Sequence, residues 1–432
     1  MQIIVVIFSL GVLSMVSSTL PAKTGKGHFS LSDSISKFNS KFFDKICQGE
    51  DGNIFYSPLS IHMLLSQVYL GSPTNSSTNK ELAVLLELNQ EDTTGLLNSY
   101  QQARNSQESS KLTNRNVVKI ANKIYMADDF SIKKGFTSSI EHNFKTSIEK
   151  VNFSNMNETA GKINSFVKNK TNGLISKIYE PTDLNPSLKL IMVNAIYFKG
   201  IWKHPFKTDK TATATFFIDN VTSTNFLAMA LTEKFRTILV NEINARVLQL
   251  PYVNDKISMI IILPDLGSTL RQVETKLKDF DATSLLKKLN STESYSTSVI
   301  LPKFEMSFEV KGLMKKLQSM GVTSLFDETK SNLSNISDEP LYVSKMSHNA
   351  VIKVNEEGSE AAAVTVVELQ TRSIDREFIV NRPFLFYIVD HQSNIPLFVG
   401  RIIDPNGKLK LRSSNDDPAR RSDVVEDPSI HA

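Results

Sequence analysis

The sequence predicts a protein of the α+β class. Apolar residues recur at helical spacing through most of the N-terminal third of the chain. Alternating or continuous apolar runs of strand length fill most of the C-terminal third. The two kinds of segment do not follow a repeating strand–helix order and no internal repeat is present, so helices packed with mainly antiparallel strands are expected.

Several segments before residue 180 are expected to be helical. The first, residues 30–48, carries large apolar residues at helical spacing. The second begins at Ser57-Pro58, because proline suits a first helical turn, and Gly71 is expected to cap its end. The other helical segments are residues 80–88, the polar stretch 89–115, and 157–179 with a break near Asn172-Gly173.

Strands are expected where apolar residues alternate or run on without interruption. These segments are residues 117–126, 188–198, 237–250, 257–263 and 297–308. The length of 432 residues makes a division into two domains the default expectation, yet no Pro-, Gly- or Ser-rich linker interrupts the body of the chain.

The segment from Lys353 to Ser373 has a pattern of its own. It opens with a charged Glu-Glu-Gly corner, passes through small residues and ends in β-branched residues before a lone arginine. As a strand it would alternate between two faces. The uncharged face would carry Ser359, Ala361, Ala363, Thr365, Val367 and Leu369, and the other Glu360, Ala362, Val364, Val366 and Glu368. The pattern alone fits either an ordinary strand or a segment that is exposed at one time and buried in a sheet at another.

The run Glu-Glu-Gly-Ser-Glu-Ala-Ala-Ala at residues 356–363 resembles the hinge of the reactive-centre loop of serpins. Further motifs resemble serpin helices and strands, in the family's order: residues 53–61, 193–202, 300–304, 343–348, 382–386 and 397–401. The resemblance covers about residues 30–405. It implies one large domain over residues 28–405 with about three β-sheets, roughly eight or nine helices and an exposed reactive-centre loop.

The resemblance implies which bond a protease would cut. The implied hinge is Glu356, Glu357, Gly358, Ser359, Glu360, Ala361, Ala362 and Ala363. In serpins the scissile bond lies fourteen residues after the hinge glycine, which gives Arg372-Ser373. An arginine there would enter a pocket with an acidic base, so a trypsin-like serine protease is the expected partner. The alternative scissile residue, Arg376, needs a loop four residues longer and is flanked by Asp375 and Glu377.

The resemblance also implies two sites in the main sheet. The shutter, a buried polar cluster whose members must hydrogen-bond to one another, consists of Ser57, Ser60, Asn194 and His348. The breach, where the loop would enter the sheet, consists of Trp202, Lys303 and Glu356. The simpler alternatives are core packing for the tryptophan and solvated charges for the other two.

Catalysis and cofactor binding are not expected. The chain contains serines and histidines, but no Gly-x-Ser-x-Gly elbow. It has no Cys/His cluster, HExxH motif or Gly-rich phosphate loop, so neither a metal nor a cofactor is predicted. A net charge of +4 is too small to indicate a nucleic-acid partner. The region that matches the heparin-binding helix of some serpins, residues 93–112, holds only Arg104 and Lys111, so a glycosaminoglycan partner is possible in principle but not supported.

Several features indicate secretion. Residues 1–18 have the apolar stretch and small residues of a signal peptide, and the apolar run at residues 3–13 is too short to be a membrane anchor. Eight Asn-x-Ser/Thr sequons are candidate glycosylation sites: Asn75, Asn152, Asn157, Asn169, Asn220, Asn290, Asn332 and Asn335. We expect residues 406–432 to be a disordered tail, because after Arg412 five acids stand against two arginines and large apolar residues are almost absent.

The expected function is that of a secreted, monomeric suicide inhibitor of trypsin-like proteases, active in an extracellular cascade. The alternative is a non-inhibitory serpin that acts as a carrier, storage protein or chaperone, against which the small residues of the hinge argue. The one cysteine, Cys47, excludes an internal disulfide. We expect it to be a small buried apolar residue, and the alternative is a free thiol open to oxidation.

Overall fold

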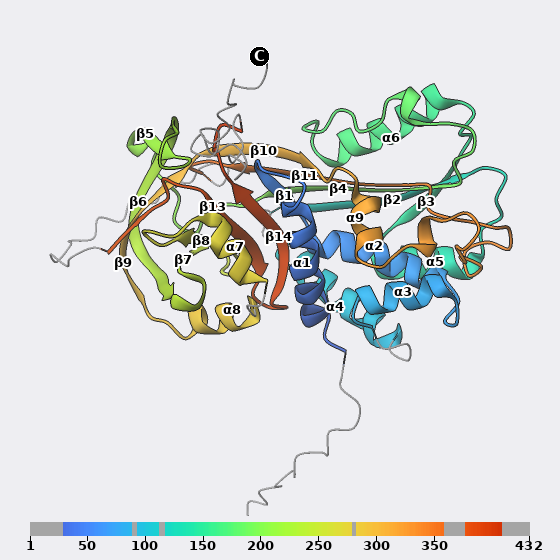
Figure 1. Cartoon of the computed structure of the whole chain (residues 1–432), viewed down its shortest axis with the longest axis horizontal. Coiled ribbons are helices and arrows are strands. Elements are labelled where there is room, and N and C mark those ends of the chain that lie inside the picture. The colour runs from blue at the N-terminus through green and yellow to red at the C-terminus, as the bar shows by residue number, and fades with distance from the viewer. Residues whose placement is uncertain (1–28, 89–92, 112–116, 279–281, 358–375, 408–432) are drawn as a thin grey trace, which may run out of the picture.

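The computed structural model describes residues 29–88, 93–111, 117–278, 282–357 and 376–407 (Figure 1). Nine α-helices lie within this part of the chain. They are α1 (Leu31–Cys47), α2 (Pro58–Gly71), α3 (Ser77–Leu85), α4 (Thr93–Lys111), α5 (Lys134–Phe144), α6 (Met156–Lys170), α7 (Leu270–Leu277), α8 (Ala282–Asn290) and α9 (Leu313–Ser319). Together with two sheets they confirm the predicted α+β class.

The first sheet has five strands in the order β10-β11-β4-β2-β3. Their bounds are β10 (Phe304–Glu309), β11 (Lys345–Val354), β4 (Leu190–Lys199), β2 (Val117–Ala127) and β3 (Ser147–Val151). Helix α6 lies over one face of this sheet and α2 lies beneath the other (Figure 1). Every residue of β4 except Lys199 is buried, which explains why its sequence is an uninterrupted apolar run.

The second sheet has nine strands, in the order β1-β14-β13-β8-β7-β6-β9-β12 with β5 paired to β6. Their bounds are β1 (Ile54–Tyr56), β5 (Ala212–Phe217), β6 (Ser223–Val240), β7 (Ala245–Pro251), β8 (Ile257–Pro264), β9 (Ser294–Pro302), β12 (Arg376–Ile379), β13 (Phe384–Asp390) and β14 (Ile395–Ile402). The resemblance implied about three sheets, whereas the described strands form two. The reason is the 18-residue β6, which pairs with β5, β9 and β7 along its length and joins the strands around it into one hydrogen-bonded unit.

Two predicted strands are divided in the structure. The segment 237–250 is a hairpin, because a turn at Asn241–Ile243 and a left-handed Asn244 (φ 51°) separate β6 from β7. The segment 297–308 divides at Lys303, with β9 in the nine-stranded sheet and β10 in the five-stranded sheet. Apolar periodicity continues through both breaks, so it does not mark them.

Gly71 is the last residue of α2 and does not cap it, because Ser72 takes that position. A Cβ at Gly71 would lie 2.6 Å from the side chain of Ile336. The glycine is therefore needed for a close approach between segments, not for a left-handed turn.

Cys47, at the end of α1, is half-buried and packs against the hydrophobic core, as expected in part, but it also contacts polar groups. Its Sγ lies 3.4 Å from a guanidinium nitrogen of Arg401, which forms a buried ion pair of 3.2 Å with Glu274. Burial, reinforced by Glu274, raises the pKa of the thiol to about 12. The thiol therefore stays protonated and is a poor nucleophile.

Candidate functional site: a parallel seam between two central strands

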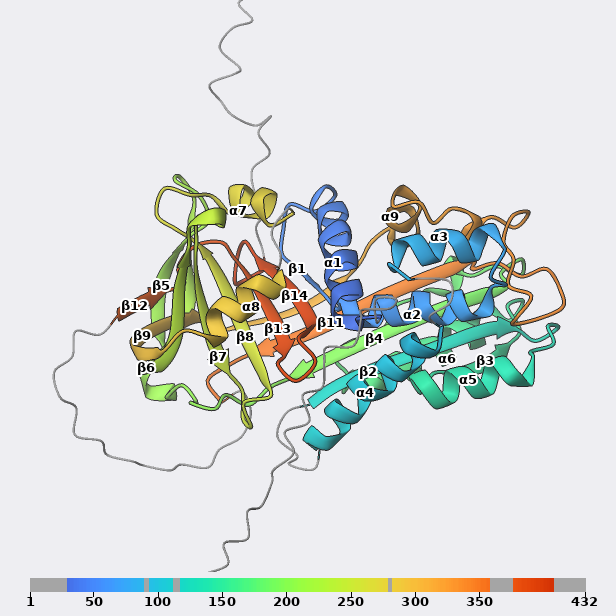
Figure 2. The ribbon, with the colours of Figure 1, turned by 90° about the horizontal axis from the view of Figure 1, so that it is seen from below.

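Two neighbouring strands of the five-stranded sheet, β11 and β4, run parallel and side by side (Figure 2). Their register is continuous from Lys345 opposite Ile191 to Ile352 opposite Phe198. The chain leaves β11 at Val354 and its described part stops three residues later, just beyond the same end of the sheet. A segment that turned back at this point would run antiparallel to both strands. The boundary between β11 and β4, the seam, could therefore accept a strand continuous with β11.

A buried polar cluster lies beneath the middle of the seam. Ser57 is the N-cap of α2, and its backbone N–H donates to Nε2 of His348 at 3.1 Å. Ser60 donates from its hydroxyl to Oδ1 of Asn194 at 3.0 Å, and His348 shares a hydrogen bond with the same oxygen through Nδ1. All four residues are fully buried. The structure thus brings together every residue predicted for the shutter.

These contacts decide the protonation of His348. Nε2 accepts from a backbone N–H, and Asn194 Oδ1 can only accept, so the ring must carry its proton on Nδ1. Burial lowers the pKa of His348 to about 3. A second proton, on Nε2, would face the N–H of Ser57, so the imidazole is held neutral. In this form it links α2 to the seam.

Asn122 on β2 extends the cluster and was not predicted. Its Oδ1 accepts a hydrogen bond from the amide nitrogen of Asn194, so polar contacts continue across a third strand. The signal in the sequence is weak, because β2 also contains Lys119 and Lys123, so Asn122 does not stand out as Asn194 does in the apolar β4.

The end of the seam is fixed by Glu356, which is 5% exposed. Its carboxylate pairs with Nζ of Lys303 at 2.8 Å and accepts a hydrogen bond from the Thr211 hydroxyl at 2.9 Å. Burial favours the neutral form, but the hydrogen bonds from Lys303, the backbone and Thr211 outweigh it and lower the pKa of Glu356. The carboxylate is therefore ionised at neutral pH and holds the chain just after β11.

Trp202 packs beside this contact. Its ring stacks on Tyr252 with centroids 4.4 Å apart, and its Nε1 donates to the carbonyl of Asn355 at 2.9 Å. The structure brings together all three residues predicted for the breach. Packing and polar contact therefore coexist at Trp202, and the partners Thr211 and Tyr252 were not predicted.

A family model described as Serpin (serine protease inhibitor) matches residues 33–405. The chain is a serpin. Serpin B4 of Homo sapiens is 33% identical over 395 residues, which cover 87% of this chain and 100% of that protein. Antithrombin-III of Bos taurus is 32% identical over 399 residues, which cover 89% of this chain and 84% of that protein.

A solved structure shows the same fold. The crystal structure of Manduca sexta serine protease inhibitor (serpin)-12 superposes with a TM-score of 0.76 at 27% identity, over 86% of this chain and 98% of that one. The predicted family is therefore confirmed by sequence and by fold.

The predicted reactive-centre loop lies outside the described residues. Of the predicted hinge, only Glu356 and Glu357 are described, and the predicted reactive bond Arg372-Ser373 also lies outside. The alternative scissile residue is described. Arg376 is the first residue of β12, where it is registered opposite Thr297, and its guanidinium lies 3.9 Å from the centre of the Tyr295 ring.

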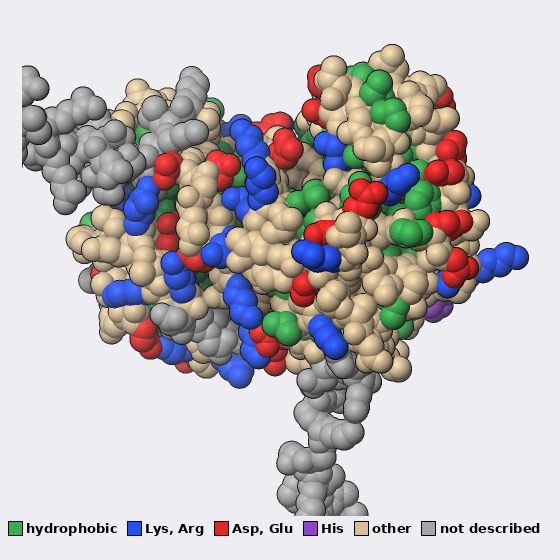
Figure 3. Space-filling view, turned by 45° about the vertical axis from the view of Figure 1, so that its right-hand side comes forward, with side chains coloured by type: hydrophobic (Ala, Val, Ile, Leu, Met, Phe, Trp, Pro, Cys, Tyr) green, Lys and Arg blue, Asp and Glu red, His purple; other side chains and the backbone are tan. Residues whose placement is uncertain are grey.

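The exposed residues show where glycans could be attached and how charged side chains are distributed. All eight sequon asparagines are exposed, so a glycan could be attached at each without disturbing the core. Acidic and basic side chains are interspersed over the face in Figure 3. Among the described residues no helix is long and apolar enough to cross a membrane, and no group of His, Cys, Asp or Glu is arranged to hold a metal ion.

Proposed function

We propose that this serpin is a secreted suicide inhibitor of trypsin-like serine proteases. The observation that carries the proposal is the parallel seam, because the predicted reactive-centre loop is continuous with β11 and begins at the end of that seam. A strand that entered there would gain hydrogen bonds along both of its edges. The family description, serine protease inhibitor, supports the same activity.

The chemistry begins with attack by the protease serine on the carbonyl carbon of Arg372. The bond to Ser373 breaks, the new amine takes a proton, and the Arg372 carbonyl remains bound to the protease as an ester. The freed segment from Gly358 to Arg372 then inserts between β11 and β4 and carries the protease with it. Trapping requires insertion to be faster than hydrolysis of the ester.

Insertion must separate groups that now touch. The backbone ladder from Lys345 to Ile352 would open, and the side-chain hydrogen bond between His348 and Asn194 would part. The small uncharged residues Ser359, Ala361 and Ala363 would enter first on the inward face. Their size favours fast entry, since bulky or charged side chains there would have to be desolvated.

The preference for a trypsin-like target rests on Arg372. The competing residue, Arg376, is already engaged in β12 and with Tyr295, so a protease would have to pull it out of the sheet. Secretion rests on the apolar segment at residues 1–18. The exposure of all sequon asparagines supports a glycosylated extracellular protein.

The test is incubation of the protein with trypsin, followed by a denaturing gel and mass analysis. We expect a complex that survives denaturation and a released fragment running from Ser373 to Ala432. The variant Arg372→Glu should form no complex, whereas the matched control Arg376→Gln should form it normally. Clean cleavage at Arg372 without a complex would contradict inhibition and favour a non-inhibitory serpin.

A further inference from the structure

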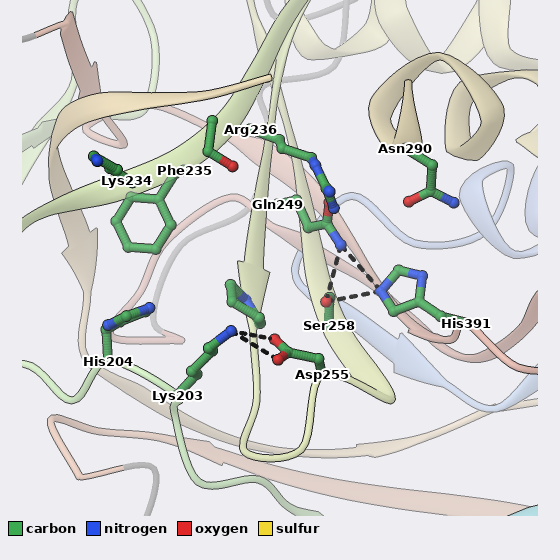
Figure 4. Close-up of a pocket in the computed structure, with 12 residues that line it drawn as sticks. Lys203, His204, Lys234, Phe235, Arg236, Gln249, Asp255, Ser258, Asn290 and His391 are labelled. Carbon is green, nitrogen blue, oxygen red and sulfur yellow. Dashed lines mark hydrogen bonds and ion pairs between the residues drawn. The ribbon is translucent and has the colours of Figure 1, made fainter. Parts of the chain in front are cut away.

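A cavity of about 390 Å³ opens on the nine-stranded sheet and has no part in the inhibitory mechanism (Figure 4). Strands β6, β7 and β8 form its floor, and the end of α8 and the residues after β13 complete its wall. Its volume lies within the range of small-molecule sites, about 300–1,000 Å³. Among the described residues that line it, only Phe235 and Pro251 are apolar, so an apolar ligand would find little to contact.

The charges around this cavity favour an anion. Lys203, Lys234 and Arg236 line it, and Asp255 is the one acid among the lining residues that the structure describes. Asp255 is already paired with Nζ of Lys203 at 2.7 and 2.9 Å. The positive charges of Lys234 and Arg236 therefore have no counter-charge within the lining. Such uncompensated cations attract anions, and a guanidinium offers a planar fork of donors that matches oxyanions.

Arg236 is oriented for this role. Its Nε donates to the carbonyl of Thr292 at 3.1 Å, which fixes the side chain at the cavity. In Figure 4 the side chain extends toward Gln249 and His391. Among the described residues, the hydrogen bond from Nε is the one that holds Arg236, and its two terminal nitrogens have no acceptor there. These nitrogens remain available to a ligand.

Two buried polar atoms at the same place lack partners. The amide nitrogen of Gln249 lies 3.1 Å from Nε2 of His391 and 3.2 Å from the Ser258 hydroxyl. Because an amide nitrogen can only donate, Nε2 accepts, and the neutral imidazole carries its proton on Nδ1. Within the described part of the chain, neither Nδ1 of His391 nor Oε1 of Gln249 has a hydrogen-bond partner. Gln249 is only 7% exposed, so leaving its oxygen unpaired is costly.

We propose that this cavity binds a phosphate or sulfate group, either free or esterified to a small organic molecule. Arg236 and Lys234 supply the charge and His391 supplies a neutral donor. Gln249 supplies an acceptor, which a protonated phosphate or a hydroxyl of the organic part can meet. The exposed Asn290, a predicted glycosylation site, lines the rim, so a glycan there would partly cover the entrance.

The proposal is tested by calorimetric titration of the full-length protein. The probes are inorganic phosphate, inorganic sulfate, glycerol 3-phosphate and a heparin-derived sulfated hexasaccharide, with chloride at matched ionic strength as the reference. Asn290→Gln protein is titrated in parallel to exclude obstruction by a glycan. We expect saturable binding of phosphate, sulfate or glycerol 3-phosphate, and the comparison between them distinguishes a free ion from a small ester. Saturable binding of the hexasaccharide alone would contradict a small ligand.

Arg236→Gln should weaken that binding at least about tenfold, because it removes a charge-assisted contact. Lys234→Gln should weaken it as well and does not threaten the fold, since Lys234 is exposed. The matched control is Lys315→Gln, which removes an exposed charge from α9, outside the cavity lining. Absence of saturable binding by every probe, or binding that Arg236→Gln and Lys234→Gln weaken no more than Lys315→Gln does, would overturn the proposal.

Discussion

His348 and Asn194 face each other directly across the seam: they are register partners on parallel strands, and their side chains share a hydrogen bond. Both also contact the start of α2, through Ser57 and Ser60. The pair therefore closes the sheet at the place where the proposed mechanism opens it. One side-chain contact stabilises the closed sheet and must break before a strand can enter.

Replacing His348 should destabilise the closed state. His348→Ala leaves the N–H of Ser57 without a partner in a fully buried site and removes one of the hydrogen bonds of the Asn194 side chain. We expect a loss of about 2–4 kcal/mol in the free energy of unfolding, measured with urea. Asn349→Ala is the matched control on the same strand, because the amide nitrogen of Asn349 is buried without a partner in the described structure. It should cost less than about 1 kcal/mol, and equal losses would contradict the role given to His348.

Stability should fall as the pH is lowered from 7 to 5. Burial lowers the pKa of both His62 and His348 from 6.5 to about 3, so the folded protein keeps them neutral while the unfolded chain takes up protons. The unfolded state then binds more protons, and each histidine should cost about 2 kcal/mol over this interval. Urea unfolding at both pH values measures the change. In His62→Gln the loss should shrink by about 2 kcal/mol, and an unchanged loss would show that His62 is not held neutral.

Replacing Lys303 should lower the free energy of unfolding more than replacing Lys353, another lysine that forms an ion pair nearby. Lys303→Met leaves the buried carboxylate of Glu356 without its cation, and we expect a loss of about 1 kcal/mol, since the lysine side chain is itself 38% exposed. Lys353→Met is the control, because Lys353 pairs with Glu305 at 3.2 Å with both side chains about half exposed. It should cost no more than about 0.5 kcal/mol. Equal effects in urea unfolding would argue against a special role for the contact at Glu356.

Much of the site could be predicted because its residues break the local pattern. Asn194 and His348 are polar within apolar strands, and buried polar groups must find partners. That rule does not say which partner is met, so Asn122 and Thr211 were missed. Their contacts depend on which strands become neighbours.

The division of the strands was harder to predict. The apolar pattern runs through the turn at Asn244 and through Lys303, because residues on both sides of each break are buried. Where one strand ends is decided by how segments that are far apart in the sequence pair with each other in the sheets. The length of β6, which joins the strands around it into one sheet, is a result of the same long-range pairing.

A charge added to the hinge should reduce trapping of the protease only if it lies on the face that turns inward when the loop inserts. Ser359 belongs to the predicted inward face and Glu360 to the outward one. Ser359→Arg should convert the inhibitor into a substrate of trypsin, because slow insertion leaves time for the ester to hydrolyse. In Glu360→Arg, most cleavages by trypsin should still end in a stable complex. The yield of stable complex per loop cleaved measures both, and full trapping by Ser359→Arg would refute the insertion step.

The most direct test of the account is to lock the seam. Asn349 and Ala195 are register partners across it, and neighbouring strands place Cα atoms about 5 Å apart, within reach of a disulfide. The control lock joins Lys353 to Glu305, which are partners on the adjacent β10–β11 pair. Both double-cysteine variants are made with Cys47→Ala and tested with trypsin before and after reduction.

With the disulfide formed, Asn349→Cys/Ala195→Cys should be cleaved at Arg372 without forming a stable complex, and reduction should restore trapping. Lys353→Cys/Glu305→Cys should trap trypsin in both states. A denaturation-resistant complex formed by the oxidised, seam-locked protein would contradict the claim that a strand enters between β11 and β4.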